Sequence, residues 1–198
     1  MSTLSLRPAE AEDEDGIANV CLQTADNGQD ASANFSRPDL PGLVWSTPYI
    51  VHSPQHCFVV ETHNRIVGFI VTTTHSREFE LWQRTYWWPE VERRLAGFVP
   101  TTSHDKEALD TIDFVKTPAP AYADDYPAHL HINLLPEGQG GGFGRRLIET
   151  ASDKLRQGGV KRLHLGVSFE NLNAIGFYKA LGFTEIVRTG ALILGKDL

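Results

Sequence analysis

The stretch GQGGGFGRR, at residues 138 to 146, limits most strongly what this chain can fold into, because it joins two regular patterns. It places five glycines in nine positions and ends in two arginines. The segment before it, AHLHINLL (128–135), alternates apolar and polar residues, which predicts a strand. The residues after it predict one apolar stripe on a helix of about four turns: Phe143, Leu147, Ile148, Ala151 and Leu155. The glycines therefore form a junction between a strand and a helix, not a flexible linker.

This junction has the chemistry of an anion site. The first N–H groups of a helix have no partner within the helix, and the helix dipole adds about half a positive charge at that end. Such an end binds phosphate groups, and glycines let a ligand approach the backbone closely. Arg145 and Arg146 add positive charge.

Elsewhere the chain mixes strand and helix patterns. The strand–helix–strand–helix order from residue 128 favours an α/β domain with parallel pairing there. We find no repeat and no linker, so residues 1–198 are expected to form a single domain. The remaining predictions are a strand at 3–7, a helix at 13–25, irregular loop at 26–56, a hairpin at 57–74, a strand at 160–168, a short helix within 171–183 and one or two strands at 183–195.

Residues 75–127 fit neither pattern cleanly and are predicted to be an insert with aromatic-rich helices. Phe79, Trp82 and Tyr86 fall on one helical face, and Pro89 interrupts it. Loop-like segments follow, with Pro118, Pro120 and Pro127. Two interpretations stay open: the aromatics of LWQRTYWWPE line a substrate pocket, or the insert packs its own small core.

Composition excludes some classes of function. A net charge of −7 argues against nucleic-acid binding and leans slightly towards cationic acceptors. The two cysteines, Cys21 and Cys57, lie in apolar patterns, which favours buried free thiols over a disulfide or a metal site. The N-terminus lacks a signal-peptide pattern, and no apolar run approaches the roughly 20 residues of a membrane span. We therefore expect a cytoplasmic protein with no membrane or metal partner.

Gln139, Gly142 and Gly144 form a QxxGxG sequence, which matches neither the P-loop nor the Rossmann fingerprint. It resembles the pyrophosphate-binding motif of the GCN5-related N-acetyltransferase (GNAT) family. The preceding INLLPE is similar to the strand and Pro-Glu that lead into that motif. Downstream, NLNAIGFYKALGF (171–183) resembles the second signature of the family. Two motifs in the expected order strengthen the resemblance.

The resemblance implies a GNAT fold: a central, mixed, mostly antiparallel sheet whose fourth and fifth strands are parallel and splay apart, flanked by helices. It also implies acetyl-CoA as cosubstrate and acetyl transfer to an amine in a ternary complex. The front half of the chain resembles, more closely, the acetyltransferase-like region of O-GlcNAcases and its stand-alone bacterial relatives. Some members of that group look like pseudo-enzymes.

The resemblance also assigns residues to the cosubstrate. Backbone amides from Gln139 to Arg145 would hold the pyrophosphate, and main-chain groups of the splayed strand would meet the pantetheine arm. Of Asn171 and Asn173, one would cap the helix and one would meet the arm, without distinction between them. The implied cofactor-binding set is Leu134, Leu135, Gln139, Gly140, Gly141, Gly142, Phe143, Gly144, Arg145, Asn171, Asn173, Phe177 and Tyr178.

Tyr178 is the candidate acid that protonates the departing thiolate, and the alternative is a tyrosine that only packs. A base must also deprotonate the amine. His129 and His131, on the polar side of their strand, are the candidates, with Glu170 and Asp124–Asp125 as others. Asn133, on the same strand face, cannot act as a base.

The predicted function is therefore an acetyl-CoA-dependent N-acetyltransferase acting on an amine-bearing small molecule or peptide, as a monomer or homodimer. The alternative is an acetyltransferase-like module that binds CoA or a protein or peptide partner and does little or no chemistry.

Overall fold

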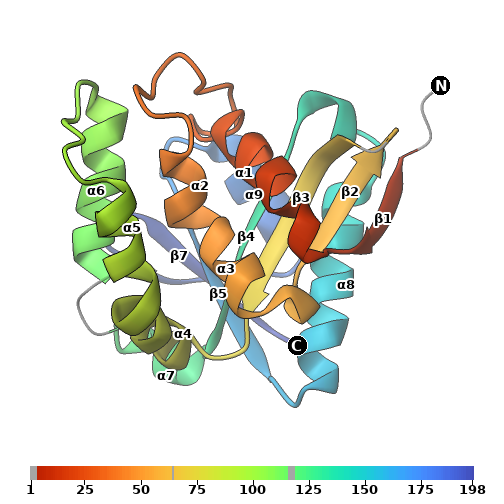
Figure 1. Cartoon of the computed structure of the whole chain (residues 1–198). Helices are drawn as coiled ribbons and strands as arrows, with labels where there is room; N and C mark the ends of the chain where they lie inside the picture. The colour runs from red at the N-terminus through yellow and green to blue at the C-terminus, as the bar shows by residue number, and fades with distance from the viewer. Residues whose placement is uncertain (1–3, 64, 116–118) are drawn as a thin grey trace.

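One mixed sheet organises the molecule (Figure 1). The computed structural model describes residues 4–63, 65–115 and 119–198. Seven strands of this described part lie in the order β1-β2-β3-β4-β5-β7-β6. All neighbours are antiparallel except β4 and β5, which are parallel, as predicted. The strands are β1 Ser5–Pro8, β2 Phe58–Thr62, β3 Arg65–Thr73, β4 Ala128–Leu134, β5 Arg162–Val167, β6 Thr184–Arg188 and β7 Leu192–Asp197.

Helices cover both faces of the sheet. In Figure 1, α1, α2 and α3 lie in front of the central strands and α8 lies behind them. The α-helices are α1 Glu14–Leu22, α2 Leu40–Trp45, α3 Thr47–His52, α4 Ser76–Trp82, α5 Trp88–Arg94, α6 Ser103–Val115, α7 Tyr122–Asp125, α8 Phe143–Gln157 and α9 Leu172–Ala180. Short 3₁₀ turns span Ala11–Asp13, Pro54–His56 and Pro136–Gly138, and Gln83–Trp87 forms a π-helical turn.

The prediction of irregular loop at 26–56 is wrong in its second half. Residues 40–56 fold into α2, α3 and a 3₁₀ turn. Pro41 and Pro48 lie in the first turns of α2 and α3, where a missing N–H costs no hydrogen bond. Pro41 and Pro48, which contributed to the prediction of a loop, therefore lie at the beginnings of helices.

The alternation of β4 is confirmed and divides its side chains between the two faces. Leu134 lies near the start of α8 on one face, whereas on the other His129 bonds to Tyr49 of α3 and Asn133 bonds to Thr24, just after α1. The predicted stripe of α8 is buried against the sheet, and Leu147, Ile148 and Leu155 have no exposed surface. Gly159, with φ of 84°, follows the helix and ends it.

The insert packs a second core. Trp87 and Trp88 are buried in a cluster that includes Leu40 of α2 and Ile112 of α6. The predicted single face does not extend to Tyr86, which is 66% exposed, because the π-helical turn shifts the register of the side chains. The loop predicted after Pro89 contains α6, and Pro118 lies outside the described residues.

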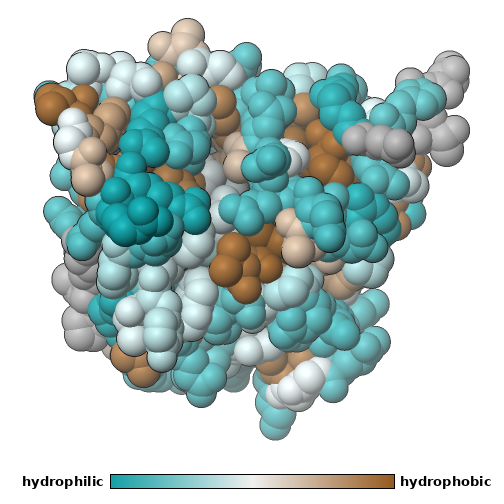
Figure 2. All heavy atoms as spheres, in the orientation of Figure 1, coloured by the Kyte–Doolittle hydropathy of each residue, from teal (hydrophilic) through white to brown (hydrophobic). Residues whose placement is uncertain are grey.

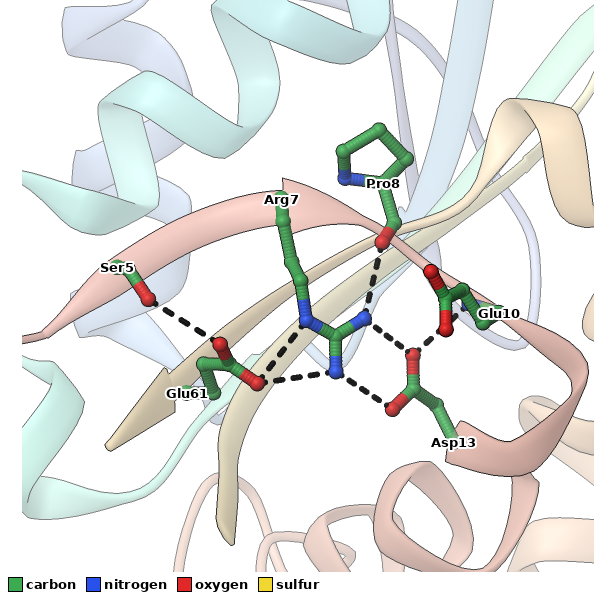
Figure 3. Close-up of polar contacts among 6 residues, drawn as sticks. All are labelled: Ser5, Arg7, Pro8, Glu10, Asp13 and Glu61. Carbon is green, nitrogen blue, oxygen red and sulfur yellow. Dashed lines mark hydrogen bonds and ion pairs between the residues drawn. The ribbon is translucent and has the colours of Figure 1, made fainter. Parts of the chain in front are cut away.

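An ionic cluster ties the edge strand β1 to its neighbours (Figure 3). The Arg7 guanidinium donates to both carboxylate oxygens of Asp13, at 2.7 and 2.8 Å, and its Nε donates to Glu61 of β2 at 3.0 Å. The bond from Arg7 holds the pKa of Asp13 below its ordinary value. The cluster joins β1, β2 and the start of α1, so it fixes the first helix on the sheet.

Cys21 and Cys57 are buried free thiols, as predicted. Hydrophilic residues cover most of the face shown in Figure 2, and hydrophobic residues form small separate patches. Among the described residues, no helix combines the length and apolar character needed to cross a bilayer.

The contact between α1 and α2 predicts one sharp effect on stability. A Cβ at Gly42 would lie 2.7 Å from the Cβ of Ala18, which cannot rotate away. We expect Gly42→Ala to lower the free energy of unfolding by about 1–3 kcal/mol in urea denaturation. The control is Gly176→Ala in α9, where a Cβ would meet nothing within 4 Å; it should be neutral or stabilise by up to about 1 kcal/mol. A Gly42→Ala protein as stable as the parent would contradict this packing.

Candidate active site

Parallel strands β4 and β5 pair at only two positions. Ala128 lies opposite Leu163, and His129 lies opposite His164. Beyond them β4 pairs only with β3, and β5 pairs only with β7. The facing edges of the two strands therefore diverge, and an unpaired strand edge offers N–H and C=O groups to a ligand.

The alternation of β4 decides which main-chain groups face this opening. The Leu135 N–H donates to Val67 O at 2.8 Å, so Leu135 faces β3. Leu134 then faces β5. The carbonyl of Leu135 accepts from Gly138 N–H, also at 2.8 Å. Leu134 thus keeps its main-chain N–H at the opening, whereas both main-chain groups of Leu135 are already bonded, contrary to the predicted role of Leu135 with the pantetheine arm.

The glycine-rich turn presents a row of free amides. Gly140 and Gly142 adopt φ of 76° and 77°, which favours glycine. Gly142 caps α8, and the first helical bond runs from Arg146 N–H to Gly142 O. Within the part of the chain that the structure describes, none of the N–H groups from Gly140 to Arg145 donates a hydrogen bond. Gly141, Phe143 and Gly144 belong to this row.

Gln139 has a different role from the one predicted. Its N–H donates to Pro136 O at 3.1 Å, so this amide is not free. Its side-chain Nε2 donates to Leu134 O at 2.9 Å. Gln139 therefore fastens the turn to the end of β4, which fixes where the free amides lie.

Gly144 lets α8 approach its neighbours. A Cβ there would lie 3.1 Å from Phe177 of α9 and 3.4 Å from the Leu134 side chain. Phe177 thus packs against the start of α8. Arg145 lies on the exposed side, 3.5 Å from Glu149, and Arg146 lies 4.6 Å above the Phe143 ring.

Tyr178 on α9 is buried and keeps its proton at neutral pH. Its ring lies 5.4 Å from Phe177 and 5.6 Å from Phe183. Burial raises the pKa of the phenol, so the neutral form persists. A buried, protonated phenol is the form that a proton donor needs.

The two asparagines that begin the second motif take different roles. The Asn171 side chain accepts from Ala174 N–H at 3.1 Å and caps α9. Asn173 lies exposed in the first turn of the same helix. Asn173 is therefore the one of the two whose side chain is left for a ligand.

A cleft of about 580 Å³ opens on the polar face of β4. Such a volume suits a small-molecule site. Five segments supply its wall: β4, the end of α1 with the loop after it, the end of α2, α6, and the turn between β5 and α9. The lining residues are Cys21, Thr24, Ala25, Asp26, Asn27, Phe35, Trp45, His104, Glu107, His131, Asn133, Ser168 and Glu170.

His131 lines this cleft, but His129 does not. Burial, with a smaller effect of His164, lowers the pKa of His131 to about 4. At neutral pH the imidazole is therefore uncharged and able to accept a proton. The Asn133 side chain donates to Thr24 Oγ1 at 2.7 Å, which holds β4 against α1.

His129 is held in a hydrogen-bonded chain instead. The Ser76 hydroxyl donates to Pro127 O at 2.7 Å, so it accepts from His129 Nδ1–H at 2.6 Å. His129 Nε2 then accepts from the Tyr49 hydroxyl at 2.6 Å. Burial lowers the pKa of His129 well below its ordinary value, with further effects of His164 and His131. Both ring nitrogens are occupied, which argues against the predicted base role.

The other candidate bases lie in different places. Glu170 lines the same cleft as His131. Asp124 pairs with Arg77 at 2.6 Å, and Asp124 and Asp125 line a separate hollow with Gly158 and Gly159. The sequence missed Asp26, Phe35, His104 and Glu107, which reach the cleft only because the loop after α1 folds against α6. No residue of the aromatic segment 81–90 lines it.

Comparisons with known proteins agree with this geometry. A family model described as the acetyltransferase (GNAT) family matches residues 26–183. The chain belongs to the GNAT family. It is therefore an N-acetyltransferase by class, and its cosubstrate is acetyl-CoA. The sequence prediction of the family is confirmed.

Solved structures of this family superpose on nearly the whole chain. The structure described as SsHAT is 31% identical over 98% of both chains, with a TM-score of 0.91. A Drosophila melanogaster polyamine N-acetyltransferase is 16% identical over 99% of this chain and 100% of that one, with a TM-score of 0.61. A putative acetyltransferase from Salmonella typhimurium, solved with acetyl-CoA, is 14% identical over 98% and 94%, with a TM-score of 0.55. The last two likenesses show the fold.

Asp105 fixes the α6 wall of the cleft and gives a pH-dependent prediction. Its buried carboxylate accepts from the Ser36 N–H and hydroxyl and from the N–H groups of Thr101 and Thr102. Burial alone would raise the pKa, but these bonds outweigh it and lower the pKa of Asp105 from 3.8 to about 2. The folded state therefore favours the charged carboxylate, and this stability is lost as the pH falls from about 4 to about 2.

We expect Asp105→Asn to lower the free energy of unfolding by about 1–3 kcal/mol at pH 7. The difference from the parent should shrink towards pH 2, as measured by urea denaturation across this range. Asp110→Asn, on the exposed side of the same helix, is the control and should change stability by less than about 0.5 kcal/mol. A difference that does not depend on pH would refute this role of the carboxylate.

Proposed function

We propose that the chain transfers the acetyl group of acetyl-CoA directly to an amine bound in the cleft. The observation that carries this proposal is the position of β4. On one face of this strand Leu134 packs near Gly144 at the start of α8, which carries the free amides, and the other face forms the floor of the cleft. A cosubstrate held along the open edge of β4 would bring its thioester to an amine in the cleft, and this proximity supplies much of the acceleration.

The amides from Gly140 to Arg145 bind the pyrophosphate of the cosubstrate in this proposal. They point outward without partners at the positive end of the 15-residue helix α8. The Leu134 main chain meets the pantetheine arm, whose amides replace the missing strand partner. The exposed Asn173 side chain contacts the same arm. Gln139 and Phe177 position these groups.

The proposed reaction needs two proton transfers, one from the attacking amine and one to the departing thiolate. The neutral amine attacks the carbonyl carbon, so the C–N bond forms before the C–S bond breaks. Its proton passes to His131, or through water to Glu170. The ammonium of the tetrahedral intermediate is more acidic than a free alkylammonium, which favours transfer of its proton to a weak base such as His131. Tyr178 gives its proton to the departing thiolate and recovers one from solvent.

The proposal extends to the whole chain. Residues 1–198 act as one acetyltransferase domain, and the insert at 75–127 contributes the α6 wall of the cleft. The closer resemblance to the acetyltransferase-like region of O-GlcNAcases stays a prediction.

The role of Tyr178 predicts a split between turnover and binding. We expect Tyr178→Phe to lower kcat by about 100-fold or more, because the thiolate loses its proton donor. Its affinity for acetyl-CoA should stay within about twofold, as measured by calorimetry beside a thiol-release assay over a panel of amines. The control is Tyr86→Phe, which removes an exposed hydroxyl and should change neither quantity.

Full activity in Tyr178→Phe would leave the tyrosine a packing role only. Binding of acetyl-CoA without thiol release for any amine in the parent protein would instead favour an inactive binding module.

A further inference from the structure

The cleft separates an uncharged floor from an acidic rim. Cys21 and Thr24 of the floor are buried, and His131 is partly buried. Because burial keeps the pKa of His131 near 4, the floor carries no charge at neutral pH. Glu107 and Glu170 lie exposed at the rim. An amine on the floor can therefore lose its proton, whereas a cation at the rim keeps its charge and its water.

Three carboxylates come to this rim from three separate segments. Asp26 follows α1, Glu107 lies on α6, and Glu170 lies between β5 and α9. The residues that line the cleft include no lysine and no arginine. Across the described ranges 4–63, 65–115 and 119–198, none of the three forms an ion pair of 4.0 Å or less. Their negative charge is therefore left for a ligand.

Contacts at the start of α6 fix the position of the helix turn that carries Glu107. The buried carboxylate of Asp105, two residues earlier, holds Ser36 and the start of α6 through four hydrogen bonds. His104 packs edge-on against Phe35, with ring centroids 5.5 Å apart. These contacts hold the first turns of α6 against the loop that carries Asp26. Two of the three carboxylates thus lie on one locked wall.

We propose that the cleft selects diamine acceptors: one amine reacts on the floor while a second ammonium stays charged at the rim, held by Glu107 with Asp26 and Glu170. This inference rests on the proposed acetyl transfer and adds the substrate class. The cleft of about 580 Å³ has room for such a chain beside the thioester. A monoamine of the same length can place its amine on the floor equally well, but it leaves the carboxylates of the rim without a cation.

The test compares butane-1,4-diamine with butylamine in a thiol-release assay with saturating acetyl-CoA. The parent protein should show a kcat/KM for the diamine at least about tenfold higher, since the second charge adds attraction only at the rim. Glu107→Gln should lower kcat/KM for the diamine by about 3- to 10-fold, mainly through KM. The value for butylamine should fall less than the value for the diamine, because butylamine has no second ammonium at the rim.

Asp110→Asn is the matched control. Asp110 lies on α6, three residues after Glu107, and is exposed without lining the cleft. Both variants remove one negative charge from the same helix. A purely long-range effect of net charge would lower the diamine preference equally in both, and that result would overturn the inference.

The outcomes separate this inference from the transfer step. Equal kcat/KM values for the two amines would refute diamine selection and leave acetyl transfer standing. If no amine releases thiol, the transfer proposal fails, and calorimetry of the two amines with the acetyl-CoA complex decides the inference alone. Preferential binding of the diamine that is lost in Glu107→Gln supports it, and equal or absent binding overturns it.

Discussion

The structure of the site depends on the short pairing between the parallel strands β4 and β5, which leaves one edge of each strand open. β4 and β5 pair at Ala128 and His129 and no further, because β7 and β3 hold their outer edges in diverging directions. Backbone groups left without a partner are costly unless water or a ligand satisfies them. The main-chain groups at the open edge of β4 therefore need hydrogen-bond partners, and they lie next to the start of α8 with its row of free amides. Gln139 connects the two features by joining the turn to Leu134 O.

In the proposed mechanism the two reactants would be held by different physical means. Backbone dipoles at the start of α8 would bind the anionic cosubstrate, and they are fixed by glycine conformations and by the packing of Gly144 against Phe177. Side-chain carboxylates would bind the acceptor, and their placement depends on the insert through Asp105. Burial also keeps Tyr178 protonated and His131 neutral, which are the forms that the proposed acid and base need.

Local sequence patterns predicted β4 and the start of α8, which form the proposed cosubstrate side of the site. Alternation identified β4, and the glycines after Pro136 identified the start of α8, because both signals depend on neighbouring residues. The roles of Gln139 and His129 could not be predicted, since each depends on hydrogen bonds to residues set by the tertiary fold. Glu107 was missed for the same reason: it reaches the cleft across more than seventy residues from Asp26 through the packing of the insert.

The most direct test of the account is amide hydrogen exchange, followed by NMR, in the free protein and with saturating acetyl-CoA. The N–H groups from Gly140 to Arg145 should exchange rapidly in the free protein and at least about tenfold more slowly in the complex, because the pyrophosphate becomes their acceptor. The Gln139 N–H, already bonded to Pro136 O, should change little. Saturation with acetyl-CoA that leaves the Gly140–Arg145 amides exchanging at their free rate would contradict the account.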